Sequence, residues 1–130
     1  MAARLGGLER KVMEVLWTDL GVPVSVRQIE EQVPGYAYTT LLTVLTRLHR
    51  KGLVRRTKDG RAFLYAATTS REEYTAELMR EALEAVTDRS AVLARFAQSV
   101  SPAEAVVLRD VLAGLEDSKS NGRTRHDRSR

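Results

Sequence analysis

Seven cationic side chains lie within 15 consecutive residues of this chain, and one acidic side chain, Asp59, lies among them. A solvated protein surface usually mixes both signs of charge, whereas a cluster of one sign is typical of surfaces that contact phosphate groups. The segment is therefore a candidate for binding a polyanion, the alternative being a basic face that contacts solvent alone. The seven cations are Arg47, Arg50, Lys51, Arg55, Arg56, Lys58 and Arg61.

The charges of the whole chain divide into three segments. The 130 residues carry a net charge of +4. Residues 1–70 carry +5 (11 basic, 6 acidic), residues 71–117 carry −5 (5 basic, 10 acidic) and residues 118–130 carry +4 (5 basic, 1 acidic). Such an asymmetry suggests that one part of the chain meets a polyanion and that another part does not.

The composition excludes several classes of protein. Because the chain has no Cys, it cannot form a disulfide, a thiolate metal site, an iron–sulfur cluster or a cysteine nucleophile. The apolar runs are too short to span a bilayer, and the N-terminal residues lack the apolar segment of a signal peptide, so we expect a cytoplasmic protein without membrane insertion. No catalytic triad pattern, glycine-rich phosphate loop or metal motif appears, so we expect no enzyme activity, no metal and no cofactor.

The sequence predicts three short helices, and the third of them carries the first cations of this segment. Apolar residues at helical spacing predict helices over residues 8–17, 26–33 and 38–51. Ser25 is a suitable N-cap for the second helix, and Gly52 follows the third at the position that glycine favours after a helix end. The expected buried face of the third helix consists of Leu41, Val44, Leu45 and Leu48.

After Gly52 the spacing of apolar residues no longer has the period of a helix. Residues 53–58 and 61–66 are compatible with strands and flank Asp59-Gly60, which is a strong signal for a β-hairpin. Three short helices followed by a hairpin is the order of a winged helix-turn-helix. We therefore predict a mainly α fold with a small β-hairpin, in which residues 1–68 form a winged-helix DNA-binding domain.

The polar side of the third helix is the candidate reading surface for double-stranded DNA. A helix fits the major groove, where Thr contacts base edges or a thymine methyl and Arg reads guanine. Leu42 is expected on the same outward side, where it would contact thymine methyls or a protein partner, and the cations of the hairpin would contact phosphates or the minor groove. The expected DNA-binding residues are Thr39, Thr40, Leu42, Thr43, Thr46, Arg47, Arg50, Lys51, Arg55, Lys58 and Arg61.

Residues 69–117 are predicted to form a helical dimerisation region, and residues 118–130 a disordered basic tail. Ser70, Asp88 or Ser90, and Ser101 are candidate starts of three helices. Their apolar residues are too many to be buried against one small winged helix, so a symmetric homodimer is the simplest way to cover them. The expected dimerisation residues are Tyr74, Leu78, Val86, Leu93, Phe96, Leu108, Val111, Leu112 and Leu115.

Two motifs carry a resemblance to a known family. The first is Thr40-x-x-Thr43-x-x-x-Arg47-Leu48-x-x-Lys51-Gly52, and the second is Lys58-Asp59-Gly60-Arg61-x-Phe63-x-Tyr65. Together with the opening Leu8-Glu9-x-x-Val12-Met13-x-x-Leu16-Trp17, they resemble the BlaI/MecI/CopY family of penicillinase-type repressors. The resemblance extends over about residues 5–115 and suggests a mycobacterial or other actinobacterial member.

The resemblance implies a dimeric repressor on a dyad operator, often ahead of β-lactamase genes. It also implies release by cleavage in the dimerisation region after a signal from a membrane sensor-protease, at a pair that corresponds to Arg95-Phe96 where well-known members have Asn-Phe. The absence of Cys excludes the copper-sensing branch. Thr39 and Leu42 stand where the family usually has Lys and a polar or basic residue, which implies a different operator sequence.

Two other functions remain open from the residues alone. The chain could be a winged-helix module that binds another protein through Leu42 and the hairpin. It could also be a regulator that responds to a small molecule bound between dimer helices. The helices offer no polar groups that converge on an apolar pocket, so we expect no small-molecule ligand.

Overall fold

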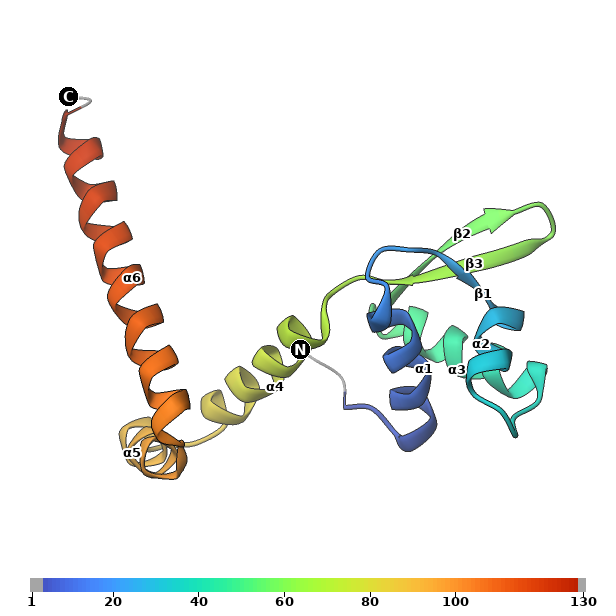
Figure 1. Ribbon diagram of the computed structural model, residues 1–130, viewed down its shortest axis with the longest axis horizontal. Helices are drawn as coiled ribbons and strands as arrows, with labels where there is room; N and C mark the ends of the chain where they lie inside the picture. The colour runs from blue at the N-terminus through green and yellow to red at the C-terminus, as the bar shows by residue number, and fades with distance from the viewer. Residues whose placement is uncertain (1–3, 129–130) are drawn as a thin grey trace. The chain divides into compact units, whose positions relative to one another are not determined.

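The computed structural model describes residues 4–128, and the side chains of residues 4–121. Contacts between Cα atoms divide the chain into two units that meet between Ala85 and Val86. The second unit contains α5 (Arg89–Ser99) and α6 (Pro102–Arg128). The first unit contains α1 (Gly7–Thr18), β1 (Val24–Ser25), α2 (Val26–Gln32), α3 (Tyr38–Arg50), β2 (Val54–Asp59), β3 (Ala62–Ala67) and α4 (Arg71–Glu84) (Figure 1).

Capping hydrogen bonds fix the start of α2, and a glycine follows the end of α3. The Ser25 hydroxyl accepts a hydrogen bond from the Gln28 amide, and the Gln28 side chain accepts one from the Ser25 amide, which caps α2 in both directions. After α3, Gly52 has a φ of +81°, a left-handed conformation that glycine adopts without strain. The predicted helices over 8–17, 26–33 and 38–51 are therefore confirmed within a residue or two.

The sheet is antiparallel and three-stranded, in the order β1-β3-β2. Asp59 pairs with Ala62, so the two residues of the hairpin turn are Gly60 and Arg61, with φ +64° at Gly60. The short strand β1 pairs Val24 with Tyr65 and was not expected, because two residues are too few to give an alternating pattern. The helices, this sheet and the projecting hairpin form a winged helix-turn-helix (Figure 1).

The core of the first unit is built around α3. Leu41, Leu45 and Leu48 are fully buried, and α3 contacts α1, α2 and β2. The largest other side chains with almost no exposed surface are Met13 and Leu16 of α1, Ile29 of α2 and Tyr65 of β3. Burying one face of α3 against three neighbours leaves its opposite face free to meet solvent.

Trp17 ties α4 to the rest of the first unit. Its indole N–H donates to the carbonyl oxygen of Thr69 over 3.0 Å, and its ring centroid lies 5.5 Å from that of Tyr74. The Arg71 guanidinium lies 5.7 Å from the Trp17 ring centroid and donates to the Glu14 carboxylate. The first turn of α4 therefore packs on α1, and the division of the chain falls later than the expected boundary after residue 68.

Helix α6 extends into residues 118–130, the segment for which the sequence predicts a disordered tail. Helix α6 continues past Asp117 to Arg128, and residues 129–130 lie outside the described part of the chain. The prediction relied on the loss of apolar residues, but a helix that has already formed extends at little cost through polar residues that include no proline. No helix of the described residues is long and apolar enough to cross a membrane.

Replacing Tyr65 by Phe tests whether the buried hydroxyl group of Tyr65 destabilises the first unit. The Tyr65 hydroxyl is buried and has no hydrogen-bond partner among the described residues. An unpaired buried hydroxyl costs ~1–3 kcal/mol, so Tyr65→Phe should leave the free energy of unfolding unchanged or raise it by up to ~1 kcal/mol. Urea denaturation measures this, with Leu45→Ala as the control expected to lose ~2–5 kcal/mol. A loss of more than ~1 kcal/mol in Tyr65→Phe would mean that the hydroxyl is hydrogen-bonded.

Candidate nucleic-acid interface

The face of α3 opposite the core presents polar and basic side chains to solvent. Thr39, Thr40, Thr43, Arg47 and Arg50 are all exposed, as expected for residues that would enter a groove of DNA. Their exposure follows from the burial of the leucine side of the helix, because residues three and four apart share a face. The structure therefore brings these five predicted residues together on one surface.

The hydroxyl groups of Thr43 and Thr46 already donate one hydrogen bond each. The Thr43 hydroxyl donates to the Thr39 carbonyl oxygen over 2.9 Å, and the Thr46 hydroxyl donates to the Leu42 carbonyl oxygen over 2.9 Å. With its proton used in this way, each hydroxyl oxygen can still accept a hydrogen bond from a base amino group. Thr46 is half-buried, so Thr43 is the better placed of the two for base contact.

Leu42 is half-buried and packs against the core instead of facing outward. The expectation treated it as part of the polar face, but one residue along a helix is a turn of about 100°, which places Leu42 beside the buried stripe and next to Leu45. The half-burial leaves less of its side chain for thymine methyls or for a protein partner.

Lys51 is held within the molecule by Glu9. The Lys51 ammonium lies 2.7 Å from Glu9 Oε2 and 3.5 Å from the Arg4 carbonyl oxygen, while Glu9 Oε1 accepts from the Gly6 amide over 3.0 Å. Lys51, which the sequence predicts as a DNA-binding residue, is thus engaged in an ion pair within the chain. The pair joins the start of α1 to the end of α3, and sequence reasoning missed it because the two residues lie far apart in the chain.

The charge state of Glu9 follows from these contacts. Partial burial raises the pKa of its carboxyl group, but the hydrogen bonds from Lys51 and Gly6 and the charges of Lys51 and Arg47 together lower that pKa below its usual range. Glu9 is thus a fixed negative charge near neutral pH. It lines a hollow between the start of α1 and α3 together with Thr40, Thr43 and Arg47.

The hairpin carries a second group of exposed cations. Arg55, Lys58 and Arg61 are exposed, as predicted. The Arg56 guanidinium lies 4.6 Å from the ring centroid of Phe63 on the neighbouring strand, a cation–π contact that the sequence did not reveal. The pairing of Arg56 with Tyr65 and of Lys58 with Phe63 shows why these side chains share one face of the hairpin. Phe63 therefore packs on the hairpin, not in the core.

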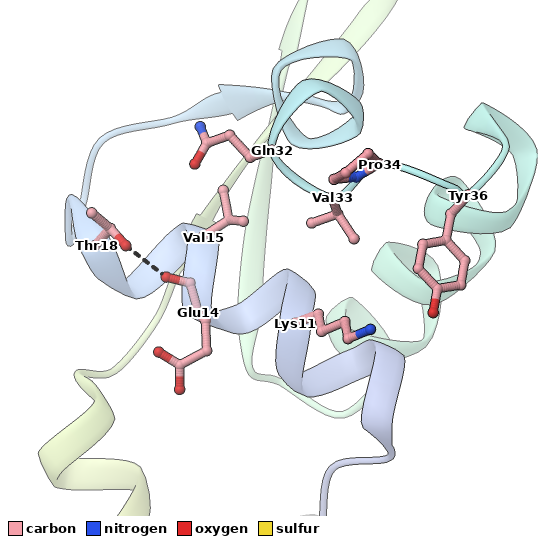
Figure 2. Close-up of a pocket in the computed structure, with 8 residues that line it drawn as sticks. All are labelled: Lys11, Glu14, Val15, Thr18, Gln32, Val33, Pro34 and Tyr36. Carbon is pink, nitrogen blue, oxygen red and sulfur yellow. Dashed lines mark hydrogen bonds between the residues drawn. The ribbon is translucent and has the colours of Figure 1, made fainter.

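Another hollow lies between α1 and α2, on Lys11, Glu14, Val15, Thr18, Gln32, Val33, Pro34 and Tyr36 (Figure 2). The Lys11 ammonium lies 5.5 Å from the centroid of the Tyr36 ring, and the Thr18 hydroxyl donates to the Glu14 carbonyl oxygen over 2.8 Å. Within the described residues, no three His, Cys, Asp or Glu side chains gather where they could hold a metal ion.

Two of the predicted dimerisation residues belong to the core of the first unit. Tyr74 is 3% exposed and stacks near Trp17, and Leu78 is half-buried against the same core. Tyr74 therefore has its packing partner inside the chain and offers little surface to a second copy, which the sequence pattern could not show. The remaining predicted residues, from Val86 onward, belong to the second unit.

The apolar side chains of the second unit are largely exposed. Phe96 of α5 is 43% exposed and Leu112 of α6 is 54% exposed. Leu93, Leu108, Val111 and Leu115 are exposed as well, while Val86 is half-buried. An apolar surface of this extent is unusual on a monomer in water and typical of an interface. Arg95 and Phe96, the pair implied as a cleavage site, are both exposed in the middle of α5.

Comparisons with known proteins identify the family of this chain. The family model of the penicillinase repressor matches residues 5–114. The transcriptional regulator BlaI from two strains of Mycobacterium tuberculosis is 44% identical over 124 residues, which cover 91% of this chain and 89% of the relative.

Solved structures with similar folds include two from Bacillus species. The monomeric form of Bacillus licheniformis BlaI in complex with the blaP half-operator has a TM-score of 0.45 at 23% identity and covers 57% of this chain and 92% of that chain. A MarR family protein from Bacillus stearothermophilus has a TM-score of 0.47 at 19% identity, over 91% of this chain and 77% of that chain. The family model and the identity to BlaI carry the assignment: this chain belongs to the penicillinase repressor family and is a transcriptional repressor of the BlaI type.

Proposed function

We propose that the chain binds a palindromic operator as a homodimer and represses β-lactamase-type genes. The observation that carries the proposal is the exposed face of α3, where Thr40, Thr43 and Arg47 lie on one side of a helix whose other side is buried. A helix held in this way presents its polar side chains to the major groove, and the hairpin cations reach the adjacent backbone. The protein acts in the cytoplasm, has no enzyme activity and needs no cofactor.

The homodimer is supported by the exposed apolar residues of α5 and α6. Two copies that cover these residues with one another remove them from water, and each buried apolar Å² contributes about 25 cal/mol. A two-fold symmetric pair also presents two α3 helices to two half-sites of a dyad. The occupant of this apolar face is therefore a second copy of the chain.

Release from the operator is proposed to occur by cleavage at Arg95-Phe96, after a signal from a membrane sensor-protease. In a single copy, α5 is a helix of 11 residues that contains no buried side chain, whereas in the proposed homodimer the second copy covers Phe96. Cleavage is therefore expected in copies that have separated from their partner, where a helix with so little burial opens locally at low cost, as a protease requires. Arg95 stands at the position of Asn in well-known members, so the protease that acts here would have to accept a cation.

Binding to DNA should be specific and steeply dependent on salt. We expect the full chain to bind a duplex that carries the dyad upstream of its own gene more tightly than a scrambled duplex. The slope of log K against log salt should be about −0.9 for each phosphate contacted. Fluorescence anisotropy at several salt concentrations measures both. Binding that is indifferent to sequence and to salt would contradict the proposal and favour a protein-interaction module.

Arg47→Ala should remove a base contact. We expect it to cost about 1–3 kcal/mol on the operator and to relax the preference at one base pair. Arg55→Ala is the matched control on the hairpin: it should weaken binding to every DNA alike and reduce the salt slope by about 1. Titration of duplexes with single base-pair changes measures the preference. Equal losses on all duplexes for Arg47→Ala would make Arg47 a phosphate contact instead.

A further inference from the structure

An acidic residue lies among the residues that are proposed to meet DNA. Glu9, in the first turn of α1, lines the same hollow as Thr40, Thr43 and Arg47 of α3. Surfaces that bind nucleic acid normally exclude carboxylates, because a carboxylate repels phosphate groups. The position of Glu9 on this surface therefore needs an explanation other than the packing of α1.

Both oxygens of the Glu9 carboxylate are in use. Oε1 accepts from the Gly6 amide over 3.0 Å, which caps α1, and Oε2 binds the Lys51 ammonium at 2.7 Å. The Glu9 side chain is 13% exposed and that of Lys51 is 32% exposed, so the pair is shielded from solvent more than an ordinary surface pair. The Lys51 ammonium is thus directed toward α1 and not outward.

We infer that Glu9 is a specificity-determining residue, which withholds Lys51 from DNA phosphates and keeps a negative charge beside the reading face of α3. This inference rests on the proposed function. Non-specific binding consists almost entirely of phosphate contacts, so a withheld cation and a fixed carboxylate weaken it most. The operator complex is also held by base contacts and loses a smaller share of its affinity. The ratio of the two affinities rises as a result, which is how repulsive elements create specificity.

The pair could instead serve only to fasten α1 to α3. In that case its loss would lower the stability of the first unit and leave the salt dependence of DNA binding unchanged. The two roles therefore differ in a quantity that can be measured.

Glu9→Gln separates these roles. Gln keeps an oxygen that can accept from the Gly6 amide, so the cap of α1 survives, but it carries no charge. We expect the variant to bind scrambled DNA about three- to tenfold more tightly, with a salt slope steeper by about 0.9 for each bound copy. The preference for the operator over scrambled DNA should fall. In Glu9→Gln/Lys51→Met the salt slope should return to the wild-type value, because the released cation is absent.

Glu14→Gln is the matched control. Glu14 lies on the same helix and is also paired, with Arg10 and Arg71, but its partners lie on α1 and α4 and not on α3. It should leave the affinity for scrambled DNA and the salt slope unchanged, although it makes the same change in net charge. An equal gain in Glu14→Gln would reduce the effect to net charge and overturn the inference.

The remaining outcomes are equally decisive. Unchanged or weaker binding of scrambled DNA by Glu9→Gln, with circular dichroism showing a folded chain, overturns the inference. A Glu9→Gln slope equal to that of the wild type does the same. The proposed function is judged separately, from the wild type: if the wild type does not prefer the operator to scrambled DNA, that proposal fails, whatever the variants do.

Discussion

The burial of one side of α3 is the constraint on which the rest of the first unit depends. Leu41, Leu45 and Leu48 fill the space between α1, α2 and the sheet, and truncation of such a residue costs ~2–5 kcal/mol. Because a rigid helix cannot bury both sides here, the same contacts decide that Thr40, Thr43 and Arg47 face solvent. The stability of the first unit and the proposed reading of DNA thus depend on opposite sides of one helix, and a residue on either side can be changed with little direct effect on the other.

Fewer cations of the basic segment are available to a ligand than the sequence alone suggests. Lys51 is bound by Glu9, and Arg56 stacks on Phe63, so two of the seven cations are held by neighbours within the chain. The other five cations lie on α3 and on the hairpin, the two elements that a winged helix brings to DNA. Charge counting along the sequence locates the surface, and the contacts within the fold decide which cations are available.

Much of the fold could be predicted because its signals are local. The stripe of α3, the Ser25 cap, Gly52 and Gly60 each act within a few residues, so the helices and the hairpin were placed closely. The errors came from contacts between distant residues. Tyr74 packs on Trp17, Lys51 pairs with Glu9 and β1 gains its strand character from pairing with Tyr65. The helix beyond Asp117 was missed for another reason, because helix extension needs no buried face.

The exposed apolar residues of the second unit have their proposed partner in another copy of the chain. Sedimentation velocity of the full chain with a dyad operator duplex tests this most directly. We expect two wild-type copies for each duplex. Leu112→Asp, which places a charge on the apolar face of α6, should instead give duplexes that carry a single copy at concentrations where the wild type binds in pairs. A single copy of the wild type on a complete dyad, or paired binding unchanged by Leu112→Asp, would rule out the proposed homodimer.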